Sequence, residues 1–291
     1  MGNCILEIQN LTKYYGKIKG VENLSLSLNK GEIFGFIGPN GAGKSTTIRS
    51  VMNLINKTSG KVLVNGKEFN KNDIQTNEII GYLPSEINLY DDLKVCEMLN
   101  YHEKFYNKDI HSRRKELVKK FELDEKKKIE DLSLGNLKKL GIILAFMHEP
   151  KLLILDEPTS GLDPIMQNVL FDLLKEEKDK GNTILYSTHI LNEVSKICDR
   201  VGIIKDGKLI KIDTIENINS NNQPIITIVS KDIKQIIKEM QIQPIQEEMN
   251  VIKFKNNFKD DELIKHLAKY SINKILIEEP TLEDMFMHYY E

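Results

Sequence analysis

Short apolar runs alternate with polar, helix-prone segments along the first two thirds of the chain. The apolar runs that are predicted as buried strands lie at residues 33–37, 152–155, 183–186 and 201–204. Residues 4–37 contain shorter β-like runs separated by turn residues. A charged, helix-prone stretch extends from about 86 to 150, and a long helix is predicted at about 164–180. Strands that alternate with helices form a parallel sheet with helices on its faces, so the pattern predicts an α/β fold.

The last quarter of the chain has a different texture. A polar stretch at residues 217–224 is typical of a linker. Beyond it, strands are predicted at 225–229, 244–248, 251–255 and 274–277, and helices at 232–240, 258–270 and 282–290. This alternation indicates a small α+β domain, for which a ferredoxin-like fold is a candidate. We therefore expect a domain at 1–213, a linker at 214–224 and an accessory domain at 225–291.

Composition and charge narrow the classes of partner. The chain has 291 residues, and its 41 Lys and Arg against 43 Asp and Glu give a formal net charge of −2. A near-neutral chain has no bulk attraction to nucleic acid or anionic lipid, so no nucleic-acid partner is expected. The length is sufficient for one large domain or two smaller ones with a substantial core.

Cysteine usage and the absence of targeting features indicate the compartment. The three cysteines, Cys4, Cys96 and Cys198, are odd in number and lack metal-ligand spacing, which is typical of a reducing compartment. The amino terminus has no signal-peptide pattern, and apolar runs such as 142–147 are far shorter than the roughly 18 residues that cross a bilayer. We expect a soluble, cytosolic chain.

One glycine-rich segment matches a phosphate-binding motif. Residues 38–45 fit G-x-x-x-x-G-K-[ST], directly after the strand at 33–37 and before a helical run at 46–54. In such a loop the backbone N–H groups surround the phosphates, Lys44 reaches the β- and γ-phosphates, and the Ser45 hydroxyl binds Mg²⁺. The residues predicted to contact the nucleotide here are Gly38, Pro39, Asn40, Gly41, Ala42, Gly43, Lys44, Ser45 and Thr46.

A second pattern supplies the remaining chemistry. The apolar run at 152–155 ends in Asp156 and Glu157. Because a buried parallel strand exposes its carboxyl end at the ligand crevice, Asp156 is predicted to hold Mg²⁺ through its hydration shell. Glu157 is predicted to act as the general base on the attacking water. Together with the glycine loop, this pattern predicts a chain that binds a nucleoside triphosphate with Mg²⁺.

Four further segments carry a family resemblance. Residues 132–136 (Leu-Ser-Leu-Gly-Asn) occupy the place of an LSGGQ signature, and residues 160–163 resemble a D-loop ending in Asp163. Residues 187–189 resemble the segment that carries the switch histidine, here His189. Tyr15 matches an aromatic residue that stacks on adenine. With these motifs in this order, residues 6–211 resemble the nucleotide-binding subunit of ATP-binding cassette (ABC) transporters. The resemblance implies a phosphate-loop ABC ATPase domain with a parallel-sheet core, an antiparallel β-subdomain and a helical subdomain.

The same resemblance implies a site shared between two copies. In this family two subunits dimerise head to tail, so each ATP lies between one chain's glycine loop and the other chain's signature. Ser133 and the Gly135 N–H would then donate to the γ-phosphate across the interface, and His189 would contact the γ-phosphate or the attacking water. A homodimer that closes on ATP and opens after hydrolysis is therefore expected, with Lys44, Glu157 and His189 as its catalytic residues.

The chain departs from the family pattern at two places. Ser85 stands where the Q-loop glutamine is expected, with Glu86 next to it as a substitute if the loop shifts by one residue. The signature has Leu134 for its first glycine and Asn136 for its glutamine. Since Ser133 and Gly135 are retained, activity is expected to survive. Coupling between ATP and the partner subunit is the property that Ser85 brings into question.

The resemblance also implies a partner and a place of work. With no span of its own, the chain is expected to act as the ATPase subunit of an exporter, docked at residues 86–110 on a separate transmembrane permease at the cytoplasmic face of the membrane. The carboxyl-terminal segment 280–286 is similar to those of bacterial drug- and antimicrobial-peptide-resistance exporters. The alternative for this domain is a packing or dimer-stabilising module without a substrate role, in which Phe286, Tyr289 and Tyr290 pack rather than recognise a ligand. Two alternatives for the function stay open: a cassette ATPase unrelated to transport, and an ATP-binding regulator that hydrolyses poorly.

Overall fold

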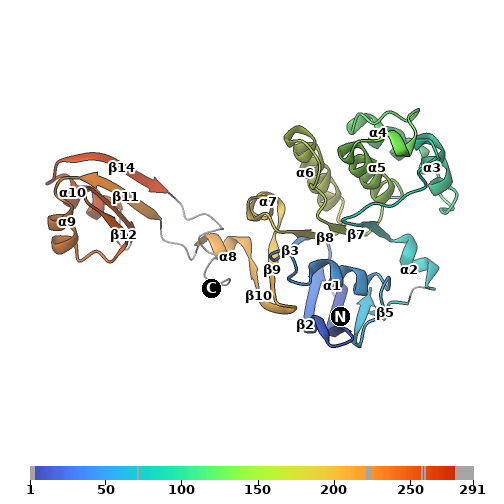
Figure 1. Cartoon of the computed structure of the whole chain (residues 1–291), viewed down its shortest axis with the longest axis horizontal. Helices are drawn as coiled ribbons and strands as arrows, with labels where there is room; N and C mark the ends of the chain where they lie inside the picture. The colour runs from blue at the N-terminus through green and yellow to red at the C-terminus, as the bar shows by residue number, and fades with distance from the viewer. Residues whose placement is uncertain (1–3, 71, 221–223, 257, 259, 279–291) are drawn as a thin grey trace. The chain divides into compact units, whose positions relative to one another are not determined.

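The computed structural model describes residues 4–70, 72–220, 224–256, 258 and 260–278. The chain forms two compact units, Met1–Ile215 and Glu216–Glu291, and each is treated by itself below (Figure 1). The helix predicted at 282–290 and the segment 280–286 lie outside the described residues. Across the described ranges, no helix is both long and apolar enough to cross a membrane.

A four-stranded antiparallel sheet opens the first unit. Its order is β2-β1-β4-β5. The strands are β1 (Cys4–Tyr15), β2 (Ile18–Asn29), β4 (Ser59–Val64) and β5 (Lys67–Glu68). Buried and more exposed positions alternate along most of β2 and are interspersed along β1, as expected for strands that pack one face on a core. This sheet corresponds to the antiparallel β-subdomain that the family resemblance implies.

A six-stranded sheet forms the centre of the first unit. Its order is β10-β9-β3-β8-β7-β6, and all neighbours are parallel except the edge pair β10 and β9. The strands are β3 (Ile33–Ile37), β6 (Ile80–Leu83), β7 (Leu152–Asp156), β8 (Thr183–Thr188), β9 (Arg200–Lys205) and β10 (Lys208–Thr214). Every residue of β3, β7 and β8 is buried, which is typical of parallel strands covered on both faces.

Helices cover this sheet and extend beyond it. Helix α1 (Lys44–Val51) shares one apolar core with both sheets, in which Ile48 and Val51 pack with residues of β1, β3 and β7. The helices α6 (Pro164–Asp179) and α7 (Leu191–Ile197) contact β8. A helical subdomain lies between β6 and β7 in the sequence and comprises α3 (Val95–Glu103), α4 (His111–Lys120), the short 3₁₀ helix η1 (Ile129–Asp131) and α5 (Leu134–Phe146) (Figure 1). The five-residue helix α2 (Ile74–Glu78) precedes β6.

A buried ion pair joins the helical subdomain to the rest of the first unit. The Arg113 guanidinium on α4 donates to Glu177 on α6, with 2.7 Å between Nη2 and Oε1, and both side chains are at most 8% exposed. Asn182 Nδ2 also donates to the Glu177 carboxylate. Because the two charges are paired and hydrogen-bonded, they are tolerated in the interior.

The second unit has an α+β fold. Its elements are β11 (Ile225–Ser230), α9 (Ile233–Met240), β12 (Pro244–Glu248), β13 (Val251–Lys255), α10 (Asp260–Leu267) and β14 (Ile272–Glu278). The sheet order β12-β13-β11-β14, with all neighbours antiparallel, is the ferredoxin-like arrangement that the sequence pattern suggested. Residues 214–224 were expected to be a linker, but helix α8 (Ile215–Ser220) begins within them, directly after β10.

Candidate functional site

The carboxyl ends of four parallel strands bring the predicted site residues to one edge of the central sheet. The phosphate loop follows β3, Ser85 comes two residues after β6, Asp156 ends β7 with Glu157 next, and His189 follows β8. The register pairs Ile37 with Thr188 and Asp156 with Ser187, so neighbouring strand ends lie level. Segments more than a hundred residues apart in the sequence therefore meet where the crevice of such a sheet binds ligands.

The phosphate loop depends on glycine at several positions. Gly41 and Gly43 have φ angles of 81° and 108°, in the left-handed region that favours glycine. At Gly38 a Cβ atom would lie 2.4 Å from the Ile204 carbonyl oxygen. Gly43 is also the N-cap of α1, and no side chain caps that helix. The first-turn N–H groups of α1 are thus available to an anion, which the partial positive charge of the helix end favours.

Lys44 points its ammonium back into this loop. Its Nζ donates to the Gly38 carbonyl at 2.7 Å and to the Pro39 carbonyl at 3.2 Å, and it lies 3.6 Å from Glu157 Oε1. The side chain is buried, and this burial lowers the pKa of Lys44 while the nearby Glu157 carboxylate opposes the shift. The cation is therefore held between the loop and the end of β7.

Asp156 presents an unpaired carboxylate oxygen. The residue is 0% exposed, and its Oδ1 accepts from the Ser187 hydroxyl at 2.9 Å, whereas the buried Oδ2 has no hydrogen-bond partner. The Ser45 hydroxyl on α1 makes no hydrogen bond within the described residues either. A buried carboxylate oxygen without a partner is costly, and a hydroxyl and a carboxylate suit a hard divalent cation. These two side chains fit Mg²⁺ by their chemistry.

Glu157 has a constrained backbone and a side chain directed at two partners. Its φ of 50° lies in the left-handed region, which costs a non-glycine residue roughly 1–3 kcal/mol. Its N–H donates to the Ser187 carbonyl at 3.1 Å. The carboxylate Oε1 lies 3.2 Å from His189 Nδ1 as well as near Lys44. Strained backbone of this kind often accompanies a function.

A buried carboxylate supports the segment before His189. Glu193 on α7 accepts from the Tyr186 hydroxyl at 2.9 Å and from the Thr188 hydroxyl at 2.7 Å. The Thr188 hydroxyl also accepts from the Ile190 N–H at 3.0 Å, so both neighbours of His189 are fixed. Burial, and then the Glu193 charge, raise the pKa of Tyr186. The sequence analysis missed Glu193, and its position four residues after His189 is the only local signal.

The signature residues occupy the start of α5. Ser133 is the N-cap of this helix, and its hydroxyl accepts from the Asn136 N–H at 3.3 Å. A Cβ atom at Gly135 would lie 2.8 Å from the Gly161 carbonyl oxygen, so the signature packs against the 160–163 segment of the same chain. Asp163 is the N-cap of α6, accepting from two backbone N–H groups at 3.0 Å. Among the described residues, no hydrogen bond joins Ser133 or Gly135 to the phosphate loop.

Tyr15 and Ser85 complete the set of predicted residues. Tyr15 ends β1 with an exposed ring, over which the Lys13 ammonium lies 4.7 Å from the centroid. The Ser85 carbonyl accepts from the buried Lys138 Nζ at 3.0 Å. Lys138 is a second residue near the site that the sequence analysis did not identify.

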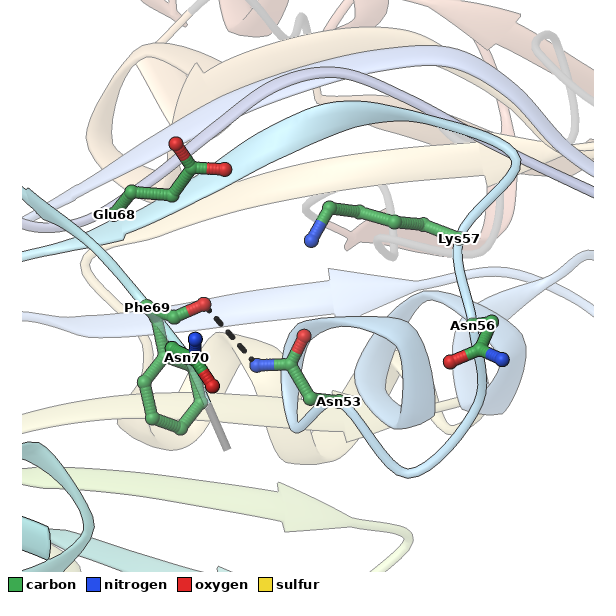
Figure 2. A pocket seen from close by; sticks show the side chains of 6 residues that line it. All are labelled: Asn53, Asn56, Lys57, Glu68, Phe69 and Asn70. Carbon is green, nitrogen blue, oxygen red and sulfur yellow. Dashed lines mark hydrogen bonds between the residues drawn. The ribbon is translucent and has the colours of Figure 1, made fainter. Parts of the chain in front are cut away.

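A separate polar hollow lies beyond the other end of α1. It is lined by Asn53, Asn56, Lys57, Glu68, Phe69 and Asn70 (Figure 2). Asn53 Nδ2 donates to the Phe69 carbonyl at 3.3 Å, whereas the Lys57 and Glu68 side chains that line the hollow make no hydrogen bond or ion pair within the described residues. The eight residues of α1 span about 12 Å, so this hollow is distinct from the phosphate loop.

The geometry defines a phosphate-loop nucleotide-binding protein, and comparisons with known proteins give the family. The sequence model described as "ABC transporter" matches residues 21–160. An uncharacterized ABC transporter ATP-binding protein of Methanocaldococcus jannaschii is 36% identical over 94% of this chain and 98% of its own. The linearmycin resistance ATP-binding protein LnrL of Bacillus subtilis is 33% identical over 98% of this chain and 97% of its own.

Solved structures agree with this assignment. A dimeric ATP-binding cassette in a post-hydrolysis state, bound to ADP and Pi, has a TM-score of 0.65 and 25% sequence identity, over 72% of this chain and 99% of that chain. The protein therefore belongs to the family of ABC transporter ATP-binding subunits. Members of this family are ATPases that form dimers and work with a membrane partner.

Proposed function

We propose that this chain is the Mg²⁺-dependent ATPase subunit of an exporter, with two copies closing on two ATP molecules and driving a separate permease from the cytoplasmic face of the membrane. The observation that carries this proposal is the cluster at the end of β7. The unpaired Asp156 Oδ2 lies beside Glu157, whose carboxylate contacts Lys44 and His189. Residues 1–215 are assigned to the ATPase and residues 216–291 to an accessory module.

Each residue of the cluster has a role in this proposal. The loop N–H groups and Lys44 bind the β- and γ-phosphates, and Tyr15 stacks on adenine. Ser45 and Asp156 would hold Mg²⁺, which when bound neutralises charge on the phosphate oxygens. Glu157 removes a proton from the attacking water. His189 holds the Glu157 carboxylate in place through its hydrogen bond and contacts the γ-phosphate.

The second half of the site comes from the other copy. Within the chain no hydrogen bond links Ser133 or Gly135 to the phosphate loop across the described residues. Ser133, the N-cap of α5, is exposed, and Gly135 in the first turn of that helix packs against Gly161. A helix N-terminus of this kind suits the γ-phosphate of a nucleotide held by another chain. The dimeric form of the similar cassette supports a head-to-tail pair.

An aromatic group on the helical subdomain is proposed to receive the permease. Tyr90, Tyr101 and Phe105 are exposed, and their rings pack edge to face with centroid distances of 6.3 and 5.0 Å. They lie within residues 86–110, directly after Ser85. Exposed aromatic residues are enriched at binding surfaces. Similarity to the linearmycin resistance ATP-binding protein supports export of a drug-like compound.

Ser85 favours a second candidate, an ATP-binding regulator that hydrolyses slowly. The residue is too short to replace a glutamine directly, and its hydroxyl makes no hydrogen bond within the described residues. Measurement of basal ATP turnover with Mg²⁺, alongside ATP binding, separates the two functions. The ATPase proposal expects turnover that chelation of Mg²⁺ abolishes. Tight ATP binding with no turnover would support the regulator instead.

A further inference from the structure

Lys138 is a buried cation that has no ion pair with a carboxylate among the residues that the structure describes. It lies on α5, is 2% exposed, and is five residues after Ser133 in the sequence. Its Nζ donates to two backbone carbonyls, those of Ser85 at 3.0 Å and Glu157 at 3.3 Å. Burial lowers the pKa of Lys138, whereas the charges of Asp156 and Glu157 oppose the shift. An ammonium in the interior is costly, so its placement needs a compensating role or interaction.

The two carbonyls belong to segments of different function. Ser85 lies between β6 and the helical subdomain, at the place where the family has its Q-loop glutamine. Glu157 carries the proposed general base. No other hydrogen bond joins Ser85 to Glu157 in the described part of the chain, so the ammonium bridges them.

The bridge also holds the strained peptide of Glu157. The Glu157 N–H is tied to the Ser187 carbonyl at 3.1 Å, and its carbonyl accepts from Lys138 and from the Ser160 N–H at 3.3 Å. The left-handed φ of 50° persists only while such contacts hold it. Without Lys138, one of these three restraints is lost, and the carboxylate loses orientation relative to Lys44 and His189.

We propose that Lys138 is a positioning residue that links the segment after β6, through Ser85, to the general base Glu157. The ammonium replaces the connection that a glutamine side chain would make from the Ser85 position, and it makes this connection to backbone rather than to nucleotide. Because α5 begins at the signature, one helix then connects the signature, the permease-facing segment and the base. This inference rests on the proposed ATPase function.

Steady-state ATPase kinetics of Lys138→Met test the proposal. This change removes the three donors and keeps an unbranched apolar side chain of similar length. We expect kcat to fall by about 10- to 100-fold while KM and the ATP dissociation constant change less than about twofold, since orientation and not binding is lost. Lys139→Met is the matched control, because the neighbouring Lys139 is half-buried and makes no polar contact within the described residues. It should retain the wild-type kcat.

A double-mutant cycle distinguishes positioning from a structural role. If Lys138 acts through Glu157, Lys138→Met in a Glu157→Gln background should reduce kcat less than about twofold further. The proposal would be overturned if Lys138→Met reduced kcat equally in both backgrounds, or if it left kcat unchanged. It would also be overturned if Lys138→Met lowered kcat, ATP affinity and the thermal midpoint together. If Lys138→Met does not fold, Lys138→Gln enters the same cycle with the same criteria. Absence of turnover in the wild-type chain would refute the ATPase function itself, which is a separate result.

Discussion

His189 Nδ1 lies 3.2 Å from Glu157 Oε1, across the ends of the neighbouring strands β8 and β7. The same carboxylate oxygen lies 3.6 Å from the Lys44 ammonium, so one glutamate joins the phosphate loop to the residue after β8. The cation and the imidazole therefore direct the carboxylate that is proposed as the general base. The position of His189 is in turn fixed by Glu193 through Thr188.

Replacement of His189 tests whether this residue orients the Glu157 carboxylate. His189→Ala should lower kcat by about 10²-fold and leave ATP binding nearly unchanged, because the carboxylate loses an orienting partner and the γ-phosphate loses a contact. Coupled-enzyme ATPase assays and nucleotide titration give the two values. His266→Ala, at an exposed position on α10, is the matched control and should behave as wild type. A wild-type kcat in His189→Ala would exclude this histidine from the reaction.

Asp156 is expected to govern the dependence of nucleotide binding on Mg²⁺. Its buried, unpaired Oδ2 loses its charge in Asp156→Asn. Wild-type affinity for ATP should drop when Mg²⁺ is chelated, whereas the variant should bind ATP with the same weakened affinity in either condition. Titration calorimetry with and without EDTA measures the difference. An unaltered response of the variant to Mg²⁺ would place the cation elsewhere.

Ser133 is expected to act on the nucleotide of the other copy. Ser133→Arg should abolish dimer formation on ATP, since the added bulk and charge fill the exposed start of α5, while a dilute monomer keeps its ATP affinity. Ser112→Arg, at an exposed position on α4, controls for a new surface charge. Sedimentation and nucleotide titration separate the two properties. Weaker ATP binding by the Ser133→Arg monomer would contradict a shared site.

His148 makes stability depend on pH. The neutral ring donates from Nε2 to the Ile80 carbonyl at 3.1 Å and stacks on Tyr106, while its buried Nδ1 has no hydrogen-bond partner in the described part of the chain. Burial lowers the pKa of His148 to about 4, and the pKa of the neighbouring His102 is lowered as well. Between pH 6.5 and 4, His148 is protonated in the unfolded chain but stays neutral in the folded chain. The free energy of unfolding should therefore fall as the pH falls through this window, by about 3 kcal/mol from His148.

The variant His148→Gln isolates this contribution. Glutamine keeps a donor for the Ile80 carbonyl but does not titrate, so acid protonation of other groups remains the same in both proteins. Urea denaturation at pH 7, 5.5 and 4.5 should give curves whose stability difference narrows toward low pH. A constant difference between wild type and His148→Gln at all three values would rule out this histidine as the titrating group.

Much of the fold and half of the site follow from local sequence. The phosphate loop is contiguous, and Asp156, Glu157 and His189 each end an apolar run, so strand ends of a parallel sheet had to bring them to one edge. The ferredoxin-like second unit follows from its alternating pattern in the same way. Helix α8 was not predicted because it is only six residues long, and Ile215 and Ile218 are too few apolar positions among its polar residues to separate a short helix from a linker.

The supporting residues could not be predicted because their partners are distant in sequence. Lys138 lies 53 residues from Ser85 and 19 from Glu157, and a lysine near a signature has no local pattern that places it in the interior. Thr188 and Glu193 are closer together, yet their hydrogen bond depends on how α7 returns to β8. Ser133 was predicted as a ligand of nucleotide, and its additional role as the N-cap of α5 emerged only from the structure.

The shared, hydrolysing site is tested most directly by the state of Glu157→Gln in ATP and Mg²⁺. Loss of the base should slow hydrolysis by about 10²–10⁴-fold, so the closed form accumulates. Size-exclusion chromatography with light scattering, combined with quantification of bound nucleotide, should find twice the mass of one chain and two ATP molecules per dimer. A monomer that retains its own ATP, or wild-type turnover by the variant, would contradict the account.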